Sequence, residues 1–219
     1  MEPLQLVALL KGHKNYIQTH NYPDPDAVAS AFGLQYFLRQ HGVDAVICYD
    51  GTVDKLSTKK MFDVFQIEVL AADQIKDMTE EDYIVAVDSQ KYNANLTDLA
   101  GDEVACIDHH PTVIECAYQY GDIRKAGACS SLIAQYFYLT DTPMEQTVAA
   151  ALAYGIKVDT ADFIRGVTEL DLDMFAYVYK RADVDKLKIM YQDVLELDDL
   201  KAYGAAIDNI RINDGVGLD

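Results

Sequence analysis

Short apolar runs alternate with amphipathic stretches along this chain, and turn-forming residues bound each run. The runs are rich in Val, Ile and Tyr, as strands are, whereas the stretches between them have helical periodicity. The pattern predicts strands at 16–19, 45–49, 64–70, 83–87 and 104–107. Alternating strands and helices favour parallel pairing. We therefore predict an α/β fold with a mostly parallel sheet of five or six strands and helices on both faces.

The predicted helices begin with an N-terminal one, ahead of the first strand. A second helix follows that strand and ends at Gly42, and one of its faces is apolar: Ala27, Ala31, Leu34 and Leu38. Two more are expected at about 130–139 and 145–156, and beyond Glu169 the pattern is wholly helical.

The last part of the chain has a different character. An acidic amphipathic stretch at 188–208 predicts a connecting helix, which leads to a strand at 207–212 and a turn at Asp214 and Gly215. We interpret 1–187 as one α/β domain. Residues 188–219 are interpreted as a linker helix and the start of a truncated C-terminal domain.

The charge of the chain limits its partners. Asp and Glu number 36 against 18 Lys and Arg, so the formal net charge is −18. Such a surface repels phosphate backbones and argues against coating long nucleic acid. An excess of carboxylates suits a protein that concentrates cations, although most of these side chains simply form a solvated surface.

The four cysteines form no CxxC pair, so we interpret them as reduced packing residues. The apolar run at 4–10 is short and lacks a basic segment before it, unlike a signal peptide. No stretch approaches the length of a membrane span. These features predict a soluble, cytoplasmic protein without a membrane partner.

Polar side chains able to bind metal follow four of the predicted apolar elements. The segments are His20 to Asp26 (which includes Asp24), Asp88-Ser89, Asp108-His109-His110, and Asp159-Thr160. The carboxyl ends of parallel strands share one edge of a sheet, so these groups are expected to converge. So many like charges need cations between them, and oxygen ligands with imidazoles suit Mn²⁺ or Mg²⁺ better than soft metals. The sequence therefore predicts a two-metal cluster.

Each signal has an ordinary interpretation when it stands alone. An Asp-x-Asp pair often caps a helix, and an Asp at the end of a strand often forms a turn. A pair of histidines is often a surface feature, and Asp159-Thr160 is also typical of a helix end. Their occurrence together at matching positions favours the metal site. His13 and His41 lie outside the four segments and receive no role.

The same segments resemble the four motifs of the DHH (RecJ-like) phosphoesterases, in order. The first is His20 to Ala27 with Ser30, the second is Asp88 with its strand, and the third is Asp108-His109-His110. The fourth is Gly155-Ile156 with Asp159-Thr160 and Phe163, and the loop Gly127 to Ser131 resembles the small-residue loop before a family helix. The resemblance covers about 16–163 and points to the nano-RNase and pAp-phosphatase branch or to the exopolyphosphatase-related branch.

The resemblance implies a site with two Mn²⁺ ions, or Mg²⁺ in their place. His20 and Asp24 would hold one ion, and Asp26, His109 and Asp159 the other, with Asp88 between them. Such a pair activates water and stabilises a phosphoryl displacement.

The resemblance also implies roles around the ions. Asp88, Asp108 and His110 would form the catalytic group: His110 would contact the substrate phosphate, and Asp108 would orient the histidines. Ser130 and Ser131 would offer hydroxyls and N–H groups at a helix start to a phosphate. Arg124, together with Lys125, would add positive charge; an exposed basic pair without a role is an equally good interpretation.

The function expected from the resemblance is that of a Mn-dependent phosphodiesterase or phosphatase. Its substrates would be short oligonucleotides, dinucleotides or nucleotide phosphates, and its partners that substrate and a second copy of the chain. Two alternatives stay open: a pyrophosphatase or exopolyphosphatase, and a catalytically silent module that binds metal and nucleotide. Family members carry a second (DHHA1-like) domain with a motif of glycine and histidine, and this sequence lacks that motif.

Overall fold

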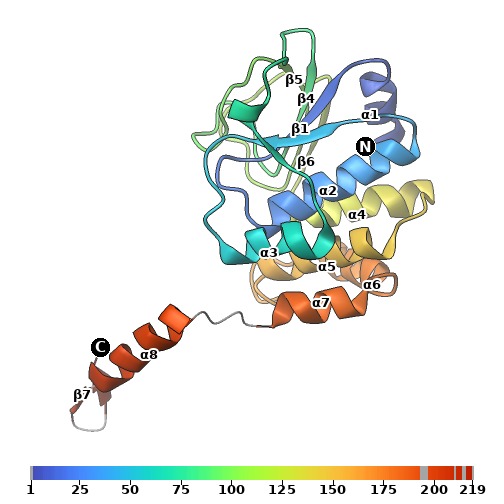
Figure 1. Ribbon diagram of the computed structural model, residues 1–219. Helices are drawn as coiled ribbons and strands as arrows, with labels where there is room; N and C mark the ends of the chain where they lie inside the picture. The colour runs from blue at the N-terminus through green and yellow to red at the C-terminus, as the bar shows by residue number, and fades with distance from the viewer. Residues whose placement is uncertain (1, 193–196, 210, 214–215, 219) are drawn as a thin grey trace.

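The computed structural model describes residues 2–192, 197–209, 211–213 and 216–218. Six strands form one sheet in the order β3-β2-β1-β4-β5-β6, and every neighbouring pair is parallel (Figure 1). The strands are β1 (Asn15–Gln18), β2 (Val46–Tyr49), β3 (Leu70–Ala71), β4 (Tyr83–Val87), β5 (Asp102–Asp108) and β6 (Tyr120–Ile123). The predicted α/β class with a parallel sheet is confirmed.

The main core lies between the helices and one face of this sheet. The helices are α1 (Pro3–Leu10), α2 (Pro25–Gln40), α3 (Leu56–Phe65), α4 (Cys129–Thr140), α5 (Gln146–Asp159), α6 (Glu169–Tyr179) and α7 (Val184–Tyr191). Their buried side chains pack with alternate strand residues such as Ile17, Val85 and Ile107. Figure 1 shows α2, α4 and α5 stacked beneath the sheet, with α6 and α7 beyond them.

The other face of the sheet is covered by connecting segments. Tyr16 and Ile84 pack there against Ile75 and Leu99, from the region of the 3-10 helix η1 (Ala72–Gln74) and from the β4–β5 connection. A second small cluster joins Ala86 and Cys106 to Leu96, Tyr118 and Ile123. The expectation of helices on both faces is therefore wrong in this detail, because the β4–β5 and β5–β6 connections contain no α-helix.

Two strand predictions also differ from the structure. Residues 64 and 65 end α3, and Gln66 then adopts a left-handed conformation with φ 56°. Of the predicted strand 64–70 only Leu70 pairs with β2, and Ala71, just beyond the predicted end, pairs as well. The strand β6 was not predicted, because Gly121 and Asp122 interrupt its apolar pattern.

The C-terminal part holds α8 (Leu197–Asn209), β7 (Arg211–Asn213) and β8 (Val216–Leu218), the last two paired antiparallel. These elements lie apart from the α/β body in Figure 1. The predicted strand 207–212 thus starts late, and the predicted turn at Asp214 and Gly215 lies outside the described residues. The division at residue 187 stays a prediction, but α7 runs through it and Met190 packs in the main core.

The strand order creates a switch point between β1 and β4. The chain leaves β1 through α2 toward β2, whereas β4 and β5 build the other half of the sheet. Gln18 pairs with Ala86. His20 and Asp88 each come two residues after this pair, so they leave the sheet at the same level. Ligands of open α/β sheets bind at such a point, outside the carboxyl ends of the strands. Among the described residues, no helix is long and apolar enough to span a bilayer.

Candidate metal centre

Asp24 combines a structural role with a place in the site. It is the N-cap of α2, and its Oδ1 accepts hydrogen bonds from the N–H groups of Asp26 (3.0 Å) and Ala27 (3.2 Å). Pro25 follows at the first helical position, where its missing N–H costs nothing. The second oxygen, Oδ2, lies 3.4 Å from Lys55 Nζ. The helix-cap interpretation and the metal interpretation of Asp24 are therefore compatible.

Asp26 lies within the first turn of α2 and is almost fully buried. Its Oδ2 accepts a hydrogen bond from the Cys129 N–H at 2.7 Å, and its Oδ1 accepts one from the Ser130 N–H at 2.9 Å. Burial raises the pKa of Asp26 to about 6, against the opposing effect of His109. The N-terminus of α4 thus holds this carboxylate in a fixed orientation.

The hydrogen bonds of Asp26 overturn the predicted roles of Ser130 and Ser131. The N–H groups at the start of α4 are directed to Asp26, and both serine side chains are fully buried. Ser130 Oγ lies 3.2 Å from Ser30 Oγ, and the Ser131 hydroxyl donates to Asp171 Oδ1 at 2.6 Å. Neither serine is placed to bind a substrate phosphate.

Asp88 lies at the centre of the site. It follows β4 in a left-handed conformation with φ 60°, which an Asp tolerates better than most residues. Its Oδ1 is 3.2 Å from His109 Nε2, and its Oδ2 is 3.8 Å from His20 Nε2. Oδ1 is buried, and among the described residues no donor has hydrogen-bond geometry to it. Burial, reinforced by Asp26, raises the pKa of Asp88 well above its ordinary value, so a cation at this oxygen would stabilise its charge.

His109 presents one ring nitrogen to the carboxylates. Its Nδ1 lies 3.1 Å from the Ala126 carbonyl oxygen, and we assign the proton to Nδ1. Nε2 then faces Asp88, and lies 3.5 Å from Asp159 Oδ2 and 4.0 Å from Asp26 Oδ2. Burial lowers the pKa of His109, but the carboxylates outweigh it and raise the pKa to about 10. An imidazole anchored by a backbone carbonyl is typical of a metal ligand.

The structure brings the six predicted ligands together in two groups. His20, Asp24 and Asp88 form one, and Asp26, His109 and Asp159 form the other; within each group the ligand atoms lie within 4.8 Å of one another. Burial lowers the pKa of His20, so its ring is neutral and able to coordinate. The unpartnered Asp88 oxygen and the donor set of carboxylates and imidazoles fit hard divalent cations.

Asp108 acts on the neighbouring His110. Its Oδ1 accepts hydrogen bonds from the His109 N–H (2.8 Å), the His110 N–H (3.3 Å) and His110 Nδ1 (2.8 Å). Its Oδ2 accepts one from Gln90 Nε2 at 2.7 Å. Burial opposes its ionisation, but the hydrogen bonds from His110 and Gln90 prevail and lower the pKa of Asp108. With Nδ1 engaged, His110 leaves Nε2 free on a half-exposed ring.

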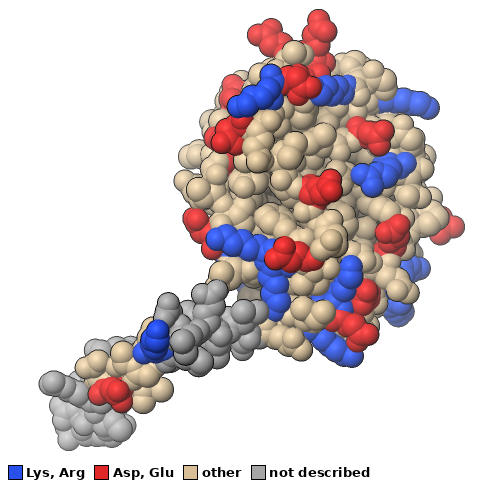
Figure 2. All heavy atoms as spheres, in the orientation of Figure 1, with Lys and Arg blue, Asp and Glu red and all other residues tan. Residues whose placement is uncertain are grey.

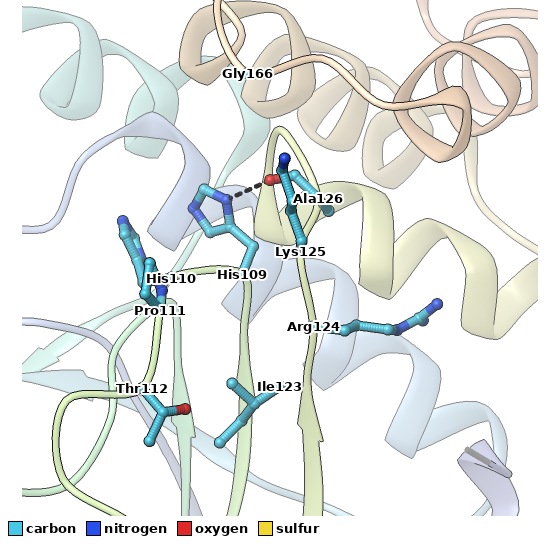
Figure 3. A pocket seen from close by; sticks show the side chains of 9 residues that line it. All are labelled: His109, His110, Pro111, Thr112, Ile123, Arg124, Lys125, Ala126 and Gly166. Atoms are coloured by element: carbon cyan, nitrogen blue, oxygen red, sulfur yellow. Dashed lines mark hydrogen bonds between the residues drawn. The ribbon is translucent and has the colours of Figure 1, made fainter.

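Arg124 does not face the metal centre. Its Nε donates to Asp122 Oδ1 at 2.7 Å, and its Nη2 donates to Gln135 Oε1 at 2.6 Å. Figure 3 shows the guanidinium directed away from His109 and His110. The predicted substrate contact of Arg124 is therefore not supported, because a carboxylate and an amide of the protein already hold this side chain.

The segment after Asp159 forms a turn next to the candidate metal centre. Ala161, Asp162 and Phe163 have φ of 48°, 57° and 65°, and such residues cost about 1–3 kcal/mol each. The Arg165 N–H bonds the Thr160 carbonyl at 2.8 Å, and Arg165 Nη2 lies 3.2 Å from Asp159 Oδ1. The strained turn thus places an arginine beside a candidate ligand.

Gln90 and Asp171 lie around the site and were not predicted, and Gly155 was named only as part of the fourth motif, without a role. Asp171 had a usable signal, since Thr168-x-x-Asp171 is a capping-box pattern and the structure forms that box. A Cβ on Gly155 would lie 2.4 Å from Ser130 Oγ and 3.2 Å from Asp26 Oδ1. Nothing local in the sequence indicates that contact.

The fold and this site together define an α/β protein with two adjacent groups of carboxylates and imidazoles, able to hold a metal ion, at the switch point of its sheet. Residues 14–156 match the model of the DHH family, N-terminal domain. The chain therefore belongs to the DHH family, as its four motifs predicted.

Two relatives of this chain are longer proteins. An uncharacterised protein of Methanocaldococcus jannaschii is 30% identical over 200 residues, which is 91% of this chain and 41% of that protein. A probable manganese-dependent inorganic pyrophosphatase of Streptococcus thermophilus is 25% identical over 150 residues, 67% of this chain and 48% of that protein. The chain thus spans less than half the length of these relatives.

Two solved structures share the fold. An exopolyphosphatase-related protein from Bacteroides fragilis aligns with a TM-score of 0.73 at 17% identity, over 96% of this chain and 64% of that chain. A putative family II inorganic pyrophosphatase of Methanococcus jannaschii aligns with a TM-score of 0.63 at 23% identity, over 86% and 61%. Both likenesses support the fold.

Proposed function

We propose that this protein is a phosphoesterase that uses two Mn²⁺ ions to hydrolyse phosphoester bonds in short oligonucleotides, dinucleotides or nucleotide phosphates. The observation that carries the proposal is the pair of ligand groups, which Asp88 links because its Oδ1 lies 3.2 Å from His109 Nε2. Within the described part of the chain this buried oxygen accepts no hydrogen bond. When bound, two divalent cations neutralise the phosphoryl group and activate the attacking water.

The residues of the chain would divide the work as follows. Asp26, held by two backbone N–H groups, and His109, held by the Ala126 carbonyl, are rigid ligands. Asp108 fixes the His110 ring, so that Nε2 can donate a hydrogen bond to a phosphate oxygen or a proton to the leaving group. A phosphate dianion needs positive charge around it, and in this acidic protein the bound cations would be the main source of that charge.

Charge supports a short substrate over a long one. The formal net charge is −18. Figure 2 shows Asp and Glu interspersed among Lys and Arg on the face in view, and the described residues there form no continuous basic stripe. A protein that tracks a long nucleic acid needs such a stripe.

Hydrolysis of inorganic pyrophosphate is the second candidate. It is favoured by the similarity to a probable manganese-dependent inorganic pyrophosphatase, and the same cation pair would serve an anhydride. The two candidates require different substrates, which makes them separable in one assay.

The test is mononucleotide release from a 5′-phosphorylated dinucleotide, with Mn²⁺ or with EDTA, beside phosphate release from pyrophosphate. Asp88→Asn is the disabling variant, and we expect activity below about one-hundredth of wild type, since even outer partners of metal ligands matter tenfold to a hundredfold. Asp44→Asn is the matched control. Asp44 is exposed and precedes β2, so it lies at the amino ends of the strands, whereas the metal centre lies at their carboxyl ends.

Each outcome decides between the candidates. Mn-dependent cleavage of the dinucleotide that Asp88→Asn removes would establish the proposal. Cleavage of pyrophosphate alone would establish the second candidate. Mn²⁺ binding without turnover of either substrate would mean that this chain is a binding module.

A further inference from the structure

A pocket of about 500 Å³ opens directly beside the metal centre (Figure 3). Its walls come from the loop after β5, from the end of β6 and from the segment that contains Gly166. His109 and His110 belong both to this pocket and to the site described above. One ligand could therefore place its phosphate at the metal centre and the rest of the molecule in the pocket.

The lining of the pocket differs in character from the metal centre. Pro111, Thr112, Ile123 and Ala126 give it a mainly apolar wall. No Asp or Glu is among the described residues that line it, in a chain where acidic residues outnumber basic ones by 36 to 18. An apolar surface without carboxylates suits the organic part of an anionic molecule.

Lys125 is the unpaired charge of this pocket. It is exposed, and it has neither a hydrogen bond nor an ion pair among the described residues. Its neighbour Arg124 is held by Asp122 and Gln135 and lends only its stem to the wall. In Figure 3 Lys125 extends beside Ala126 toward the segment of Gly166. Its ammonium group is therefore available to an oxygen of a phosphate bound beside His109 and His110, which line the same pocket.

We infer that this pocket binds the nucleoside of a nucleotide whose phosphate lies at the metal centre, and that Lys125 contacts that phosphate. The inference rests on the proposed function and narrows it to phosphoesters with an organic group. Inorganic pyrophosphate would leave the apolar wall uncovered and gain nothing from it. The volume is that of a small-ligand site and accommodates a base with its ribose.

The test compares two phosphate ligands, one with a base on its ribose and one with a hydroxyl in its place. Calorimetric titration of the Mn²⁺-loaded protein with AMP and with ribose 5-phosphate isolates the contribution of the base. We expect AMP to bind about tenfold more tightly, as burial of part of an apolar ring predicts. Thr112→Trp should fill the pocket and reduce AMP to the affinity of ribose 5-phosphate. Thr112→Ser, the matched control, should keep the tenfold difference.

Lys125→Ala should weaken both ligands by a similar factor of about fivefold, as the loss of an exposed charge pair predicts. Its matched control is Lys11→Ala. Lys11 is exposed and precedes β1, so it lies at the amino ends of the strands, away from the pocket. Thr112 and Lys125 are both exposed, so the variants should unfold at the same temperature as wild type.

Failure of the inference can be told from failure of the proposed function. Cleavage of a dinucleotide by the wild type, together with equal affinities for AMP and ribose 5-phosphate, would overturn the pocket and leave the function standing. An unchanged AMP preference in Thr112→Trp would overturn it as well. A wild type that hydrolyses pyrophosphate and no dinucleotide would overturn both.

Discussion

The Ser131 hydroxyl donates a hydrogen bond of 2.6 Å to Asp171, a residue 40 positions further along the chain. Asp171 is fully buried and also accepts from the Gly127 N–H at 2.8 Å and from the Thr168 hydroxyl at 2.7 Å. These bonds tie the start of α6 to the loop that leads into α4. Because the first N–H groups of α4 hold Asp26, the position of a candidate ligand depends on a carboxylate outside the site.

We expect Asp171→Ala to weaken Mn²⁺ binding about tenfold or more, as the loss of outer support does in other metal sites. It should also lower the free energy of unfolding by about 3 kcal/mol, because several buried donors lose their acceptor. Asp171→Asn keeps one acceptor oxygen and should recover part of both losses.

The control is Asp173→Ala, which removes an exposed carboxylate from the same helix. Urea unfolding and calorimetric Mn²⁺ titration measure the two quantities. If Asp171→Ala loses stability but binds Mn²⁺ as wild type does, Asp171 supports the fold and has no influence on the position of Asp26.

Gly155 allows α5 to approach the start of α4. A Cβ there would lie 2.4 Å from Ser130 Oγ and 2.8 Å from the Ala29 Cβ, so Gly155→Ala must displace one of the helices that carry ligands. We expect a loss of stability of about 1–3 kcal/mol from overpacking, with weaker Mn²⁺ binding. Gly204→Ala, in open space on α8, should cause no loss because alanine favours helices. Equal thermal midpoints for the two variants would contradict this account.

Asp108 is expected to affect turnover more than metal binding. Asp108→Asn keeps an oxygen near His110 but removes the charge that fixes the protonated Nδ1. A wrong tautomer at such a position lowers kcat by about a hundredfold or more, whereas the dissociation constant for Mn²⁺ should change less than about threefold. Steady-state kinetics on the preferred substrate and Mn²⁺ titration separate the two effects. A large loss of Mn²⁺ affinity would instead identify Asp108 as a ligand.

The sequence predicted which candidate ligands converge better than it predicted their surroundings, for a physical reason. His20, Asp88 and His109 each follow a buried strand of the same parallel sheet, so strand order alone brings them to one edge. Ser130 and Ser131 also belong to a recognisable motif. Whether the start of α4 can bind a phosphate, however, depends on whether a side chain of the protein already accepts hydrogen bonds from its N–H groups. Helix starts look alike in sequence whether they bind a ligand or a carboxylate of the protein.

How the second face of the sheet is covered was hard to predict for a related reason. The segments between β4 and β6 lack helical periodicity, yet Leu96, Leu99 and Tyr118 bury the second face of the sheet. A few apolar side chains on a loop are enough to bury this face, and they produce no helical or strand periodicity in the sequence. Arg124 shows the same limit, since its partner Gln135 belongs to a helix that begins after the loop.

Protons and cations should compete for the same groups in this protein. Burial raises the pKa of Asp26 from 3.8 to about 6, and carboxylates raise that of His109 from 6.5 to about 10. A raised carboxyl pKa means that the folded state binds the extra proton, so the stability it contributes is lost as pH rises from 3.8 to 6. The histidine contributes stability below pH 6.5 that is lost as pH approaches 10.

Both groups therefore destabilise the metal-free protein as pH rises, and bound cations should reverse the effect by replacing the protons. We expect the increase in Tm caused by saturating Mn²⁺, relative to EDTA, to be larger at pH 8 than at pH 5.5. In Asp88→Asn the increase should be small at both values, because the shared ligand is lost. A Mn²⁺-induced increase that shrinks as pH rises would show that the titrating groups around Asp88 are not the ones that bind the cations.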